Sequence, residues 1–329
     1  MNTELLKSIC AVKGASGEEG ATAGFILAEI KDYIDDYSID PLGNLIAHKK
    51  GPGKKMMLAG HMDQIGMMVT FIDKDGFLYF TNIGGLTPHV IHSARVRFDS
   101  GTFGVVNAEK LEEPAKMTLD KMYIDIGART REEAEKLVKI GDTAVYAGPP
   151  VIDGFKIMTP YLDDRIGCYI MIEALKKLKD LKFDLYAVFT VQEELGLRGA
   201  RASAYTVDPD YGLAFDVTIA CDTPNARKLP QKMGGGACIK LKDSSVLCHP
   251  LIVRHMEKCA KAGNIKYQFE ILEAGGTDSG AIHLSRGGVP SGVMSVATRY
   301  VHSMNEMALL SDIQDSIDLT VRILETEIE

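Results

Sequence analysis

Hydrophobic and polar residues follow two different patterns along the chain. An amphipathic stretch at 18–35 predicts a helix, and apolar runs at 44–48 and 56–60 predict strands. From 66 to 150 the pattern changes to short alternating segments, separated by Gly, Asp and Ser and interrupted by one helix-like stretch at 131–139. These segments, which are typical of a small β-rich barrel, lie at 77–81, 94–98, 103–106 and 122–126.

Longer elements return after residue 158. Helices are predicted at 164–177, at 250–262 and from 312, and they alternate with strands at 185–191, 213–215 and 267–272. Such alternation predicts an α/β fold, in which helices flank a mixed sheet and the small β-barrel is an insertion. We expect residues 1–64 and 160–329 to form a catalytic domain. Residues 65–159 are expected to form the inserted barrel, which would be used for dimer contacts.

Length and composition agree with this organisation. The chain has 329 residues, of which 46% are hydrophobic and 25% charged, which is enough for one large core and a smaller second core. A net charge of -8 argues against a nucleic-acid partner, because phosphate binding needs a basic face. Apolar runs are too short for a membrane span, and the first residues lack a secretory signal pattern. The six cysteines are scattered, so we expect reduced thiols and a cytoplasmic location.

Candidate chemistry begins where the strand at 56–60 ends, at His61 and Asp63. The strand period of two places both side chains on the same side at the carboxyl end, where open α/β sheets bind ligands. A metal-bound imidazole usually donates its second nitrogen to a carboxylate, so His61 is a candidate ligand and Asp63 its partner. Taken alone, a strand-end histidine beside a turn aspartate is the simpler interpretation.

Pairs of acids occupy two further positions of this kind. Asp163 and Asp164 open a predicted helix, so one of them can simply cap it, whereas in a metal site a carboxylate there can bridge two cations. Glu193 and Glu194 follow the strand at 185–191, and adjacent residues of an extended chain point apart. One of these glutamates can then bind metal while the other faces a water molecule. An exposed acidic turn is the alternative for this pair.

Asp216 and His302 complete the series. Asp216 follows an apolar run at 211–215, and His302 ends the apolar runs at 292–296 and 298–301. Polar residues at strand ends therefore occur five times, and they supply two histidines and three carboxylates. That set is enough for two ions that share one carboxylate, so we interpret it as a dinuclear metal site.

Six motifs follow one another along the chain: HMDQIG, PYLDDRIG, VQEELGLRGA, AFDVTIACDTP, GGTDSGAIH and TRYVHSMNEM. Together they resemble the glutamyl and deblocking aminopeptidase family of tetrahedral, dinuclear metallo-aminopeptidases, and the match spans nearly the whole chain. The resemblance implies the fold of dinuclear zinc peptidases, with a barrel inserted between the HxD motif and the bridging aspartate. It implies two divalent ions per subunit, zinc with cobalt or manganese as alternatives. It also implies short peptide substrates and a homo-oligomer, a tetrahedral dodecamer built from dimers.

By motif, the resemblance assigns the metal ligands to two groups that share one residue: His61, Asp163 and Asp216 for one ion, and Asp163, Glu194 and His302 for the other. It assigns Glu193 as the general base and Asp63 as the carboxylate beside His61, and it implies a cis peptide between Asp163 and Asp164. Two positions depart from the family without removing a ligand, Gln64 in place of the usual Glu and Met304 in place of Pro.

Residues 277 to 284 hold a further candidate. We expect Thr277 to cap a helix that runs to Leu284, and Asp278 to border the substrate pocket. His89 and His92 have helical spacing, but they lie in the predicted barrel far from the other ligands in sequence, which disfavours a second metal site.

The implied reaction is metal-assisted amide hydrolysis that removes the N-terminal residue of a peptide. The two ions lower the pKa of a shared water, and Glu193 takes its proton and later protonates the leaving amine. A deacylase or a glucanase on the same site is one alternative, but a glycosidase needs two carboxylates free to act on the sugar. A non-catalytic assembly protein is the other, and such a protein should have lost a ligand or the base.

Overall fold

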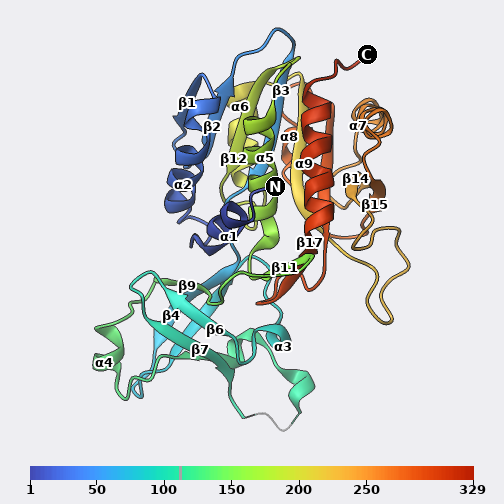
Figure 1. Cartoon of the computed structure of the whole chain (residues 1–329). Helices are drawn as coiled ribbons and strands as arrows, with labels where there is room; N and C mark the ends of the chain where they lie inside the picture. Colours follow the sequence, from blue (N-terminus) through green and yellow to red (C-terminus); the bar gives the residue numbers. More distant parts are fainter. Residues whose placement is uncertain (111–112) are drawn as a thin grey trace.

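The computed structural model describes residues 1–110 and 113–329 and has two parts (Figure 1). In one part, helices cover both faces of an eight-stranded sheet, and the other is a closed barrel of six strands that extends from one end of the sheet. This architecture confirms the predicted α/β fold class with an inserted barrel.

The sheet is mixed, and its centre is parallel. Strands β12, β3, β13 and β16 run in the same direction, so their carboxyl ends meet at one edge. Helices cover both faces of these strands, which explains why they are nearly continuous apolar runs. The order across the sheet is β1 (Asp36–Ile39), β2 (Leu45–Lys49), β12 (Asp184–Thr190), β3 (Lys55–His61), β13 (Tyr211–Ile219), β16 (Ser291–Thr298), β14 (Ala237–Lys242) and β15 (Tyr267–Ile271).

Most helices pack on the face that carries α5 (Leu162–Lys177), whose apolar side chains belong to the main core. The others on this face are α1 (Thr3–Ala11), α2 (Gly20–Ile30), α7 (Pro250–Gly263) and α9 (Leu310–Leu324), and the opposite face carries α6 (Arg198–Val207) and α8 (Ser279–Ile282). None of the helices in the described ranges is long and apolar enough to cross a membrane.

The barrel is inserted between β3 and α5. Its strands are antiparallel and follow the order β4 (Gly66–Ile72), β5 (Leu78–Ile83), β8 (Met122–Asp125), β7 (Phe103–Ala108), β6 (Arg95–Phe98) and β9 (Thr143–Tyr146). Closure removes exposed strand edges. The helix predicted at 131–139 is the shorter α4 (Arg131–Glu135), and α3 (Pro88–Ile91) contains His89.

A small three-stranded sheet connects the two parts. Strands β10 (Val151–Asp153) and β11 (Lys156–Thr159) lie after the barrel, but β11 pairs with β17 (Glu306–Leu309), which precedes α9. Before α5 begins, the chain is therefore already paired with β17, the strand that leads into α9. The division at residues 65–159 and its use for dimer contacts stay predictions.

Candidate metal centre

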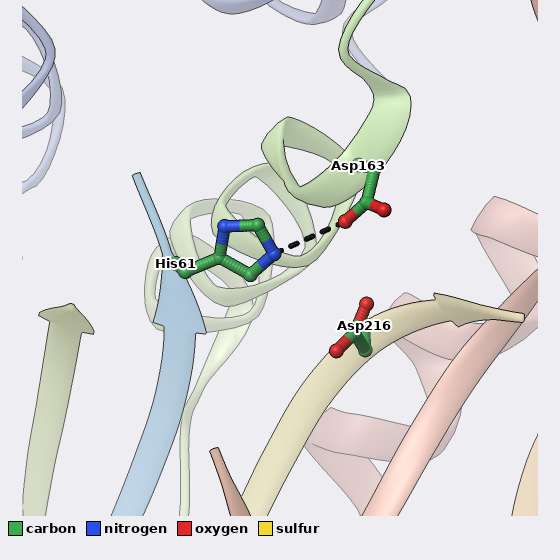
Figure 2. Close-up of side chains that lie close together, drawn as sticks. All are labelled: His61, Asp163 and Asp216. Atoms are coloured by element: carbon green, nitrogen blue, oxygen red, sulfur yellow. Dashed lines mark hydrogen bonds and ion pairs between the residues drawn. The ribbon is translucent and has the colours of Figure 1, made fainter. Parts of the chain in front are cut away.

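The parallel strands bring His61 and Asp216 to one edge of the large sheet, where the start of α5 adds Asp163. His61 is the last residue of β3 and is in register with Thr190, the last residue of β12. Asp216 is buried within β13, which continues beyond the strand predicted at 213–215. Figure 2 shows His61 and Asp216 facing the same space as Asp163, which comes from the start of α5.

Asp163 lies between the two histidines. Its Oδ1 is 3.0 Å from Nε2 of His61, and its Oδ2 is 3.2 Å from Nε2 of His302. Glu194 Oε1 also lies 3.2 Å from Nε2 of His302. The ligand atoms of His61, Asp163 and Asp216 lie within 4.8 Å of one another, as do those of Asp163, Glu194 and His302. All five predicted ligands thus lie together in the predicted groups, and their role as ligands stays a prediction.

The two aspartates at the start of α5 have different partners. The peptide bond between Asp163 and Asp164 is cis, as the resemblance implies. Asp164 Oδ1 accepts a hydrogen bond from the backbone N–H of Gly167 at 2.9 Å, and its Oδ2 accepts one from His61 N at 3.3 Å. Asp163 and Asp164 have non-helical backbone angles, so Asp164 caps the helical turns that follow them, and Asp163 is left to face the histidines.

Asp63 connects His61 to the turn that carries the two glutamates. Its carboxylate is 3.4 Å from Nδ1 of His61 and accepts hydrogen bonds from the backbone N–H groups of Glu193 at 3.0 Å and Glu194 at 3.2 Å. Ser16 Oγ donates a fourth contact at 2.7 Å. Nδ1 of His61 also lies 3.2 Å from the main-chain carbonyl of Asp63, so His61 presents Nε2 to the centre, which is the arrangement that a metal-binding histidine requires.

The two glutamates lie in a turn after β12, so the prediction of an extended chain at this point was wrong. The turn still separates their side chains. Glu194 faces His302, whereas the Glu193 side chain makes no hydrogen bond to any residue in the described ranges. Burial and the nearby charges of Asp216 and Asp278 raise the pKa of Glu193 well above its usual value. A carboxylate of this kind is suited to accept a proton near neutral pH.

Glu306 is a residue of the site that sequence reasoning missed. It is buried at the start of β17, and it accepts hydrogen bonds from the backbone N–H groups of His302 at 2.7 Å and of Asp163 at 3.0 Å. Its carboxylate therefore holds the main chain of two predicted ligands that are far apart in sequence. Burial and the charge of Asp163 raise the pKa of Glu306 to about 8. Glu306 lies in the TRYVHSMNEM motif, four residues after His302, and this position was the signal in the sequence that could have identified it.

Negative charge is concentrated at the centre. Burial lowers the pKa of His302, but hydrogen bonds to Asp163 and Glu194 more than offset this effect and raise it to about 12. Burial and the charge of Asp163 raise the pKa of Asp216 well above its usual value. The nearby buried Lys240 is already paired with two other carboxylates, 2.8 and 3.1 Å away. Imidazole nitrogens and carboxylate oxygens are zinc donors, so this set fits two divalent cations that would balance its charge.

Asp278 lies behind the centre, next to the end of β12. Its Oδ2 accepts a hydrogen bond from the hydroxyl of Thr190, which is in register with His61. Burial raises its pKa to about 6. The predicted cap was wrong, because Asp278 and not Thr277 occupies the N-cap position of α8. Contact between Asp278 and substrate stays a prediction.

Comparisons with known proteins agree with this geometry. A family model described as M42 glutamyl aminopeptidase matches residues 43–319. A protein of Acetivibrio thermocellus that carries an aminopeptidase name is 49% identical over 322 residues, which cover 98% of each chain.

Solved structures agree over the same length. Aminopeptidase APDkam598 from the archaeon Desulfurococcus kamchatkensis has a TM-score of 0.95 at 34% identity, with coverage of 99% of this chain and 94% of its own. The TET1 peptidase of Pyrococcus horikoshii, which can assemble into a tetrahedron or a large octahedral shell, has a TM-score of 0.88 at 33% identity, over 98% of each chain.

Proposed function

This chain belongs to the M42 glutamyl aminopeptidase family and is a metal-dependent aminopeptidase, and we propose that it releases the N-terminal residue of short peptides at the centre described above. The observation that carries the proposal is Asp163, which offers one carboxylate oxygen to each of two histidines. A bridging carboxylate with one histidine on either side is the ligand arrangement that two neighbouring divalent ions need.

The residues divide the chemistry among themselves. We assign His61, Asp163 and Asp216 to one ion and Asp163, Glu194 and His302 to the other, with zinc as the expected metal and cobalt or manganese as alternatives. When bound, such ions polarise the scissile carbonyl and lower the pKa of a water molecule. Glu193 accepts the proton of the attacking water and transfers it to the nitrogen of the leaving peptide. Asp63 orients the imidazole of His61 and holds the turn that carries Glu193.

The two ions also favour an N-terminal substrate. A free α-amino group would lie near one ion and, in its neutral form, can offer it a nitrogen lone pair, whereas the amide nitrogen of an acylated N-terminus cannot. Asp278 would border the pocket for the first residue. This account explains why single residues would be removed from the N-terminus.

The assembly follows from the relatives. We propose a homo-oligomer, a tetrahedral dodecamer built from dimers, with the barrel at 65–159 contributing subunit contacts. The tetrahedral assembly of the Pyrococcus horikoshii peptidase supports this proposal. We also propose a cytoplasmic location, which the six free cysteines support.

A panel of aminoacyl p-nitroanilides tests the function. Protein stripped of metal by a chelator should be inactive, and it should regain activity when zinc, cobalt or manganese is returned. N-acetylated versions of the same amides are the matched control and should resist cleavage. Metal-independent cleavage, or equal cleavage of the acetylated amides, would contradict the proposal. Hydrolysis of cello-oligosaccharides without amide cleavage would favour the glucanase alternative, which requires two free carboxylates.

A further inference from the structure

A groove lies where the barrel meets the N-terminal segment, apart from the five predicted metal ligands. Its volume is about 380 Å³. The lining includes the outer face of β6 and β9, the last two residues of α1 with the two that follow (10–13), and residues 148–150. That volume is within the range of small-molecule sites. Figure 1 shows this junction, with α1 above the barrel strands β9 and β6.

The barrel strands direct cationic side chains into the groove. Val96 and Phe98 are fully buried in the barrel core, so the alternating residues Arg95 and Arg97 point outward. Neither arginine makes an ion pair with a carboxylate within residues 1–110 and 113–329. The neighbouring Asp99 is instead paired with Lys13 at 2.9 Å. Two adjacent guanidinium groups that make no ion pair in the described ranges can bind an anion.

Apolar side chains surround these cations. Phe103 is directly opposite Arg97 on β7 and is 54% exposed, and Val145 is opposite the same arginine on β9. Pro149 and Pro150 line another part of the groove. A ligand that fits must therefore combine a negative head with an apolar body. It should lack an ammonium group, because the lining cations would repel it.

One wall of the groove is fixed in place by Gln64. Its side-chain Oε1 accepts a hydrogen bond from Gly14 N at 3.0 Å, and its Nε2 donates one to the carbonyl of Val12 at 3.1 Å. Both contacts hold the segment that carries Lys13 against the barrel. A preformed wall reduces the ordering cost of binding.

We propose that this groove binds a small organic carboxylate with an apolar body and no ammonium group. Arg95 and Arg97 bind the carboxylate, and Phe103 and the prolines contact the apolar part. The site is separate from the metal ligands and does not depend on the proposed reaction, so either proposal can fail without the other.

Calorimetric titration of the purified, metal-loaded full-length protein with N-acetyl-L-leucine tests this proposal. We expect saturable binding that weakens at least tenfold in the double variant Arg95→Gln, Arg97→Gln. Replacement of both arginines by lysine keeps the charge but loses the planar fork, so it should recover part of the affinity. The control Arg201→Gln removes the same charge from an exposed position of α6 and should bind like the parent.

Three further measurements separate the alternatives. Binding should persist in His302→Ala, because the groove does not use the metal ligands; loss there, with retention in the double arginine variant, would place the ligand at the metal centre and overturn the proposal. Inorganic phosphate should bind at least tenfold more weakly, and equal affinity would show that the site recognises charge alone. Absence of saturable binding by the parent protein would also overturn the proposal. If the double variant then changed its assembly size on sedimentation, the two arginines would serve subunit contacts instead.

Discussion

Replacement of Glu306 by glutamine removes one of the two carboxylate oxygens that accept hydrogen bonds from the main chain of the metal centre. Glu306 uses its two carboxylate oxygens for the backbone N–H groups of His302 and Asp163, at 2.7 and 3.0 Å. Glutamine has nearly the same shape but only one acceptor oxygen, so one buried N–H loses its partner. An unpaired buried group of this kind costs about 1–3 kcal/mol. Since about 1.4 kcal/mol corresponds to a factor of ten, we expect metal affinity to fall by about 10- to 100-fold.

A competition titration between the protein and a chromophoric zinc chelator measures this loss directly. Turnover of an aminoacyl amide should fall at limiting metal and recover largely when metal is in excess, because Glu306 would not act on the substrate. Glu29→Gln is the matched control, since Glu29 is paired with Lys176, at 2.6 Å, away from the centre. If folded Glu306→Gln protein binds both ions with the parent's affinity, the positioning role of Glu306 is refuted.

Three other predictions test the remaining assignments. Glu193→Gln should keep both ions and lose about 10²- to 10⁴-fold in turnover without rescue by added metal. Glu194→Gln should lose an ion, and its turnover should recover partly at high metal concentration. If added metal rescued Glu193→Gln and not Glu194→Gln, the two assignments would have to be exchanged. His61→Ala and His302→Ala should each lower metal stoichiometry by elemental analysis, and full occupancy in both would contradict the ligand assignment. Replacing residues 66–147 by a short linker should give a smaller species on size-exclusion chromatography, and unchanged assembly would count against barrel contacts.

Sequence pattern was sufficient for the buried parallel strands. The apolar run at 56–60 corresponds to β3, and the run at 185–191 to β12, because strands covered on both faces are continuously apolar. The same rule failed at Asp216, where a buried acid interrupts the run at 213–215 although β13 continues to Ile219. Helix α6 was missed, because its small and charged residues carry no long apolar stripe.

The candidate ligands could be predicted from residue type and position at strand ends, but their supports could not. Ser16 reaches Asp63 across 47 positions, and Glu306 reaches Asp163 across 143 positions. Contacts of this kind have no periodic signal in the sequence, because they depend on how the strands and turns meet in three dimensions. The candidate ligands are therefore visible in the local pattern, whereas the residues that hold their main chain are visible only in the fold.

Gln64, which replaces the usual glutamate of the family, also holds main chain near the metal centre. Its amide donates a hydrogen bond to the carbonyl of Val12 and accepts another from Gly14 N, so both of its polar groups have partners although the side chain is buried. An ionised glutamate at this position can accept but cannot donate, and it would face the Val12 carbonyl with a second negative oxygen. Because Ser16, which contacts Asp63, lies in the same N-terminal segment, the glutamine joins that segment to the support of the metal centre. The departure at position 64 is thus compatible with the proposed reaction, because it alters how the surrounding chain is held and leaves the five predicted ligands unchanged.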